Sequence, residues 1–139
     1  MPVDYHVDHE QRLVRVRLSG LITPDALFGY QQAVWSNPTV TGYDELVDMN
    51  GVESVEAPSP SNVSALAGFS ARMDGDTGPT KLAIVAADNL TFGLGRMYQA
   101  YREMKPGSTK EVGVFRSMPD ALAWLGRPHQ TRSDPIRPV

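Results

Sequence analysis

Two aspartates follow apolar runs in positions where acid/base chemistry is possible. Asp48 interrupts the run 46–49, and Asp88 comes directly after the apolar stretch 82–87. In neighbouring parallel strands the carboxyl ends meet at one edge of the sheet, where open α/β folds keep their sites. Two carboxylates at that edge are suited to act as a general acid and a general base. Neither has a His, Cys or Lys beside it, which favours the alternative that each caps a helix or holds a turn.

Metal and cofactor patterns are weak. His6, Asp8 and His9 are residue types that bind metals, but adjacent strand residues point to opposite faces and the sequence holds no distant ligand set. Gly93-Leu94-Gly95 partly matches a dinucleotide-binding loop, but Tyr98 occupies the third glycine position and the glycines fall within a predicted helix. We therefore predict no catalytic residue, no metal and no cofactor, and a close contact between this helix and the sheet.

The central stretch predicts an acidic loop at the end of a buried strand. The run 44–52 reads as a strand that ends in a sharp turn at Asn50-Gly51, and Ser59 before Pro60 has the pattern of a helix N-cap. A phosphate on Ser59 or Ser61 would also be favoured by the free amides of that helix. Arg96 either reaches an anion near the strand ends or faces solvent. The residues that we expect to bind a partner or ligand are Asp48, Asn50, Glu53, Ser54, Glu56, Ser59, Ser61, Asp88 and Arg96.

Charge and composition bound the function classes. The chain has 139 residues, 41% of them hydrophobic, no cysteine and a net charge of -3, as expected of one domain with a real core. Between Leu18 and Ala71 every charged residue is acidic, and bases gather between Thr80 and Arg116. This asymmetry disfavours nucleic acid and suits a basic protein partner or self-association, so we expect a homo-oligomer. The first residues lack a signal-peptide pattern and no run is long enough to span a bilayer, which predicts a cytoplasmic location.

Periodicity places strands and helices in alternation. The predicted strands are 4–8, 13–19, 44–52, 80–87 and 111–115, and the predicted helices are 24–36, 60–73, 90–104 and 117–126. The first two strands form a hairpin, and the others follow helices. The fold class is therefore α/β: a single-domain, mostly parallel sheet of about five strands with an antiparallel N-terminal strand and about four helices. Residues 1–126 form this domain, and 127–139 form a disordered tail.

The helices should present apolar faces to the sheet. On the first helix we expect Leu27, Tyr30, Ala33 and Val34 inside; on the second, Val63, Leu66, Ala67 and either Phe69 or Ser70. On the third, the stripe consists of Leu94, Met97, Tyr98, Tyr101 and Met104. This stripe supplies more large apolar surface than a chain of this size needs. The surplus predicts either a homodimer patch or a groove for an apolar ligand.

The element order and the segment Asp48-Met49-Asn50-Gly51-Val52 resemble the STAS domain superfamily, most closely its SpoIIAA-like branch, which is related to Sec14-type folds. Gly95-Arg96-Met97-Tyr98, Val114-Phe115 and Ala121-Leu122-Ala123-Trp124-Leu125 add to the resemblance, which covers residues 5–126. It implies a regulatory, protein-binding domain without catalysis. In anti-anti-sigma members a serine or threonine at the start of the second helix is phosphorylated. Here the matching position falls near Ala57, which puts the phosphoswitch in doubt.

The leading hypothesis is thus a non-enzymatic regulatory or protein-interaction domain. The second is the binding of a small apolar or lipid-like ligand in a Sec14-like groove. The third is a weak enzyme that uses Asp48 and Asp88.

Overall fold

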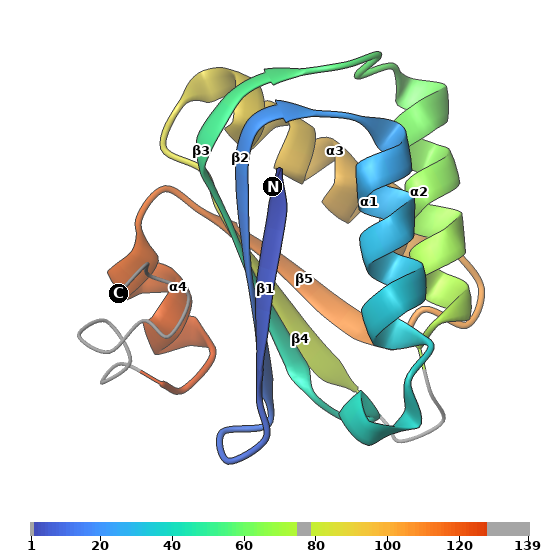
Figure 1. Cartoon of the computed structure of the whole chain (residues 1–139), viewed down its shortest axis with the longest axis vertical. Coiled ribbons are helices and arrows are strands. Elements are labelled where there is room, and N and C mark those ends of the chain that lie inside the picture. Colours follow the sequence, from blue (N-terminus) through green and yellow to red (C-terminus); the bar gives the residue numbers. More distant parts are fainter. Residues whose placement is uncertain (1, 75–78, 128–139) are drawn as a thin grey trace.

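The computed structural model describes residues 2–74 and 79–127, which form one mixed sheet with helices on both faces (Figure 1). The strands are β1 (Val3–Asp8), β2 (Leu13–Ile22), β3 (Asp44–Val55), β4 (Thr80–Val85) and β5 (Lys110–Phe115). The helices are α1 (Pro24–Tyr30), α2 (Pro60–Arg72), α3 (Asn89–Met104) and α4 (Met118–Trp124), with a π-helical turn η1 (Gln31–Trp35) and a 3₁₀ turn η2 (Pro38–Val40).

The strand order is the order of the chain, β1-β2-β3-β4-β5. β1 pairs antiparallel with β2, and every later pair is parallel. The predicted fold class, with its antiparallel first strand, is confirmed. Each parallel pair is joined by a helical crossover, because parallel neighbours cannot be linked by a tight turn.

Each main helix begins at a side chain that caps its free amides. Thr23, Ser59 and Ser117 each accept a hydrogen bond from the backbone N–H three residues later, and a proline follows each cap within two positions. Asp88 does the same for α3. A cap oxygen replaces the water that an unpaired amide would otherwise need, so these residues fix where each helix starts.

The sheet separates two apolar layers (Figure 1). On one face, the β2 side chains Val14, Val16 and Leu18 pack with Tyr30 and Val34. On the other face, α4 covers the sheet, and its core residues are Leu13, Leu46, Ala83, Val85, Ala121, Leu122 and Leu125. Because α1, α2 and α3 share the first face and α4 alone lies on the second, the thicker layer is on the side of the three helices.

The predicted sharp turn at Asn50-Gly51 is wrong, because β3 continues to Val55. β3 pairs with β4 only over 45–48, and beyond that it pairs with β2 alone. The register between β2 and β3 shifts at Arg17/Ser19 and again at Gly20/Leu21. Irregular pairing bends a strand without ending it. The two strands therefore run on together, past the edge of β4, toward the N-terminal ends of α1 and α2.

Two predicted inward positions are also wrong. Ala33 is exposed and Gln31 is buried, because Gln31 lies four residues after Leu27 and three before Val34 on the inward face, and Ala33 does not. Met104 is 73% exposed, whereas Arg102 on the same helix is buried. Arg102 donates to the Ser70 carbonyl and pairs with Asp74, so its charge is compensated between α2 and α3.

The described chain ends in a fixed contact. Arg127, the first residue of the predicted tail, donates to the Asp44 carboxylate and to the Gln11 carbonyl. The rest of that prediction, 128–139, lies outside the described residues. Among the described residues, no helix combines the length and the apolar character needed to cross a membrane.

Candidate functional site

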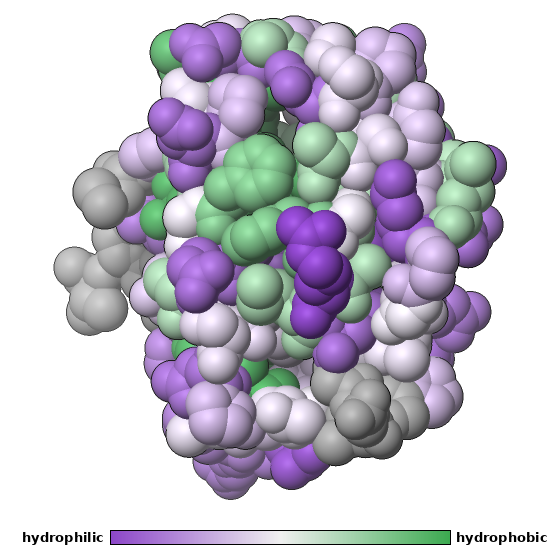
Figure 2. Space-filling view, turned by 90° about the vertical axis from the view of Figure 1, so that its right-hand side faces the viewer, coloured by the Kyte–Doolittle hydropathy of each residue, from purple (hydrophilic) through white to green (hydrophobic). Residues whose placement is uncertain are grey.

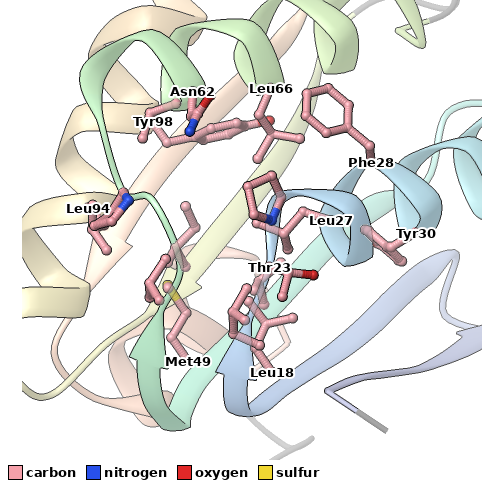
Figure 3. Close-up of a pocket in the computed structure, with 18 of the residues that line it drawn as sticks. Leu18, Thr23, Leu27, Phe28, Tyr30, Met49, Asn62, Leu66, Leu94 and Tyr98 are labelled. Carbon is pink, nitrogen blue, oxygen red and sulfur yellow. The ribbon is translucent and has the colours of Figure 1, made fainter.

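A cavity of about 140 Å³ lies between the sheet and the three helices of the thicker layer (Figure 3). The sheet provides its floor, and α1, α2 and α3 provide its walls. Its lining from the sheet and the strand ends is Val16, Leu18, Ile22, Glu45, Val47, Met49, Val55, Leu82 and Ile84; its lining from the helices and loops is Thr23, Pro24, Leu27, Phe28, Tyr30, Gln31, Glu56, Ala57, Pro58, Asn62, Val63, Leu66, Leu94, Gly95 and Tyr98. The lining is predominantly apolar, which is typical of small-molecule sites.

The roof of the cavity is made by the continuation of β2 and β3 and by the loop that follows. The Glu56 N–H donates to the Ile22 carbonyl, which ties the loop to the end of β2. Ala57 has a φ of 48°, a left-handed conformation that costs energy in any residue with a Cβ. Its carbonyl accepts from Asn62 Nδ2 and from the Ser59 N–H, both at 2.8 Å. These two hydrogen bonds hold the strained loop over the cavity.

The α3 wall lies close to the sheet because Gly95 has no side chain. A Cβ at this position would lie 3.1 Å from Val114 Cγ1 and 3.3 Å from Ile84 Cγ2. The predicted close contact between this helix and the sheet is therefore confirmed. One and three positions away from Gly95, Leu94 and Tyr98 line the cavity. Burial raises the pKa of Tyr98 to about 12, so its hydroxyl stays protonated at neutral pH.

The inner end of the cavity is a buried polar cluster. Glu45 is 3% exposed and accepts a hydrogen bond of 2.6 Å from the Tyr30 hydroxyl. Lys110 Nζ lies 3.3 Å from the Glu45 carboxylate and 3.4 Å from the centre of the Trp35 ring. Trp35 Nε1 in turn donates to the Tyr30 hydroxyl. The cluster is closed on itself, so a charged pair is held beside the cavity with its polar atoms engaged.

Burial has opposite effects on the two titratable partners of Glu45. It raises the pKa of Tyr30 well above the ordinary value, and the nearby Glu45 carboxylate adds to the rise. It lowers the pKa of Lys110, against the opposing attraction of Glu45. Tyr30 therefore acts as a neutral hydrogen-bond donor at physiological pH.

The cavity reaches the surface on the helix side. Figure 2 shows this side, with a hollow close to its top, above the largest apolar patch. The N-terminal ends of α1 and α2 lie at this level in Figure 1, and Pro24 and Pro58 from this region line the cavity. The opening thus lies between the first turns of the two helices.

Of the predicted site residues, only Glu56 lines the cavity. Asp48 and Asn50 instead hold loops: the Asp48 carboxylate accepts from the Asn50 N–H, and Asn50 Oδ1 accepts from the Ala87 N–H. Glu53 and Ser54 are exposed on β3, and Arg96 is exposed in the middle of α3. The other three predicted site residues lie on or beside helix N-terminal turns: Ser59, Ser61 and Asp88. The Ser59 hydroxyl caps α2 and lies 3.4 Å from the Ser61 hydroxyl.

Asp88, one aspartate of the predicted acid/base pair, is not prepared to donate a proton. Asp88 accepts from the backbone N–H and the hydroxyl of Thr91, and these bonds lower the pKa of its carboxyl group. A general acid at neutral pH requires a raised pKa. Asp48 lies 4.0 Å from Arg17 Nε and forms a turn with Asn50. Within residues 2–74 and 79–127, no three His, Cys, Asp or Glu side chains are grouped to hold a metal ion.

Sequence reasoning missed the residues of the inner end. Glu45 was visible as an acid at the start of the central strand, but its partner Lys110 is far away in the sequence, and only the strand order brings them together. The inward face of β2, which includes the lining residues Val16 and Leu18, could be identified because its apolar residues alternate with polar ones. Gln31 was missed because it is polar, although its spacing from Leu27 and Val34 matches the inward face of the helix.

The comparisons with known proteins agree with this architecture. No family model and no curated protein matches the chain. Among solved structures, one similar chain is an uncharacterized protein from the DUF3478 family with a SpoIIAA-like fold, from Shewanella loihica PV-4. The two have a TM-score of 0.55 and 14% sequence identity, over 88% of this chain and 91% of that chain.

The fold is SpoIIAA-like. The predicted resemblance to SpoIIAA-like domains is thus confirmed at the level of the fold. At 14% identity the SpoIIAA-like fold carries no residue roles from that protein to this one.

Proposed function

We propose that this domain is a non-enzymatic binding domain that takes one small, neutral, apolar molecule into the cavity. The observation that carries the proposal is the cavity itself. Protein interiors are close-packed, and voids larger than a water molecule are few. A cavity of about 140 Å³ with a mainly apolar lining and an opening to the surface can admit a small molecule. A ligand that fills it removes apolar surface from water.

The volume limits the size of the ligand. An apolar cavity of about 150 Å³ in another protein holds one benzene molecule. The cavity described here is of the same size, so it suits a single ring or a short branched chain. A two-chain lipid needs far more space. Of the two predicted ligand types, small apolar and lipid-like, we therefore keep the first.

The lining also limits the charge of the ligand. No Lys, Arg or His is among the described residues that line the cavity, and the two charged lining residues are Glu45 and Glu56. Glu45 is already paired with Lys110. A carboxylate ligand would lose its hydration without gaining a cationic partner, which disfavours fatty acids and aromatic acids.

Titration of the ¹⁵N-labelled protein with toluene tests this function. We expect saturable shifts in the amide signals of residues around the cavity. The variant Val63→Phe should abolish these shifts because the added ring occupies the cavity, and Val63→Leu should weaken them. The control is Ala65→Phe, which adds the same ring to the exposed side of α2. Circular dichroism confirms that each variant is folded.

Absence of saturable shifts in the unmodified protein would overturn the proposal. So would equal toluene binding by Val63→Phe and the unmodified protein, because the ligand would then lie elsewhere.

A second candidate function is the docking of a basic protein partner on the acidic surface around Glu53 and Glu56, at the end of β3. It is supported by the exposure of Glu53 and Glu56 at the end of β3. The test is a pull-down with Glu53→Lys and Glu56→Lys together, compared with the unmodified domain. Loss of a partner in the double variant supports docking at this edge; an unchanged set of partners contradicts it.

A further inference from the structure

We propose that Gln31 recognises a polar group on the ligand, and that the ligand is a single-ring molecule with one hydroxyl group, such as a phenol. This inference rests on the proposed function, because it assigns a chemical class to the molecule bound in the same cavity. It follows from three properties of Gln31: its burial, the state of its amide and the π turn that begins at it.

Gln31 is 9% exposed and lines the cavity. In the part of the chain that the structure describes, its side-chain amide makes no hydrogen bond. A primary amide can donate two hydrogen bonds and accept two more. Leaving such a group without partners in an apolar site is costly, so native proteins seldom do it without a reason. The Gln31 amide is not among the fully buried atoms that lack a partner, so it is reached from the cavity, and a water molecule or a ligand group entering there supplies its bond.

Three other polar groups that line the cavity are already engaged. The Tyr30 hydroxyl donates to Glu45 and accepts from Trp35. Near the opening, Thr23 Oγ1 accepts from a backbone N–H and Asn62 Nδ2 donates to a backbone carbonyl. A polar ligand atom that approached any of these groups would compete with an existing bond. At Gln31 it would gain a bond without breaking one.

The backbone geometry at Gln31 also points to a functional role for this residue. α1 changes at Gln31 from an α-helix to a π turn, and the Gln31 N–H is shared between the carbonyls of Leu27 and Phe28. π turns are rare and occur frequently at functional sites. Gln31 lies four residues after Leu27 and three before Val34, so the ordinary helical spacing already directs it inward with these two residues. The π turn begins at Gln31 itself, which places this rare geometry in the cavity wall.

These features select the ligand class. The cavity admits one ring, and its lining excludes an anion, as argued above. A hydroxyl both donates and accepts, so it can meet the carbonyl and the amino group of one amide. Phenol and toluene have nearly the same shape and differ in this group. Comparing the two isolates the hydrogen bond from the filling of the cavity.

The experiment measures dissociation constants of phenol and toluene for three folded proteins by ¹⁵N-monitored titration: the unmodified chain, Gln31→Leu and the control Gln32→Leu. Gln32 is the exposed neighbour of Gln31, so its replacement removes an identical amide outside the cavity. We expect Gln31→Leu to weaken phenol binding about tenfold and to leave toluene binding within about twofold. Gln32→Leu should bind both as the unmodified chain does.

The outcomes separate the two proposals. If the unmodified chain binds neither probe, the proposed function fails and this inference falls with it. If it binds both probes and Gln31→Leu binds phenol unchanged, the cavity function stands and the role of Gln31 is overturned. An equal loss of phenol and toluene in Gln31→Leu also overturns it, because Gln31 would then only shape the cavity.

Discussion

Among single residues, Glu45 and Lys110 have the most demanding environment. Both are buried, and the pair is completed by the Tyr30 hydroxyl and the Trp35 ring. A buried pair contributes little net stability when compared with apolar residues of the same size, but removing one partner leaves an uncompensated charge. Breaking the pair therefore lowers the stability of the fold by more than the intact pair adds to it.

Glu45→Ala should lower the free energy of unfolding by about 3–5 kcal/mol, because it leaves the Lys110 ammonium buried without its carboxylate. Urea denaturation monitored by circular dichroism measures the loss. The double variant Glu45→Gln with Lys110→Met should recover much of it, since neither buried charge then remains. A loss below about 1 kcal/mol for Glu45→Ala would mean that the pair behaves like an exposed salt bridge.

Tyr98 should make the protein less stable in alkali. Its pKa rises from 10.0 in the unfolded chain to about 12 in the folded protein, so between these values the folded state holds a proton that the unfolded state has lost. The stabilising contribution is complete below pH 10 and is lost as the pH rises toward 12. Urea unfolding at about pH 9 and pH 11 should show a steeper loss for the unmodified chain than for Tyr98→Phe. Equal pH dependence of the two proteins would contradict this.

At the scale of elements, the two glycines of α3 differ in what surrounds them. A Cβ on Gly95 would press on Val114 and Ile84, whereas a Cβ on Gly93 would meet nothing within 4 Å. Gly93→Ala should therefore stabilise the protein by up to about 1 kcal/mol, because alanine favours a helix. Gly95→Ala should destabilise it by roughly 1–3 kcal/mol through overpacking.

Thermal unfolding of the two α3 variants compares the same substitution two positions apart. Opposite shifts in Tm are expected. A gain in Tm for Gly95→Ala would show that α3 can move away from the sheet at no cost, and would contradict its role as a fixed cavity wall.

The elements that could be predicted are those marked by neighbouring residues in the sequence, such as a helix cap or an apolar run. The cap residues Thr23 and Ser59, each followed by a proline, start helices at the predicted positions. The apolar run after Lys81 lies in β4, also as predicted. The elements that could not be predicted depend on partners far away in the chain. Asn50-Gly51 is a common turn sequence, yet irregular pairing with β2 absorbs it into a strand. The π turn at Gln31 likewise has no local signature.

At the scale of the whole molecule, alternation of strands and helices was enough to predict the fold, because parallel strands joined by crossovers leave few arrangements. The site was not predictable in the same way. A cavity is the volume that side chains fail to fill, and it depends on packing among three helices and a bent sheet edge. Of the predicted site residues, only Glu56 borders the cavity.

Arg127 should act as a clasp between the end of the described chain and its first turn. It bonds the Asp44 carboxylate at 2.9 Å and the Gln11 carbonyl at 2.8 Å, in a partly buried setting. Arg127→Ala should lower the free energy of unfolding by about 1–3 kcal/mol. The matched control Arg96→Ala removes an exposed arginine and should change it by less than about 0.5 kcal/mol. If the two variants change the free energy of unfolding by the same small amount in urea denaturation, the Arg127 contacts do not stabilise the fold.

The same clasp has a consequence for biosynthesis. Strands are added to the sheet in the order in which the ribosome delivers them, so each new strand finds its neighbour already made. Arg127 is the exception, because it joins to Gln11, 116 positions earlier. A nascent chain can therefore form its sheet strand by strand during translation, but the turn of the first hairpin gains its bond to Arg127 only after all five strands have been made.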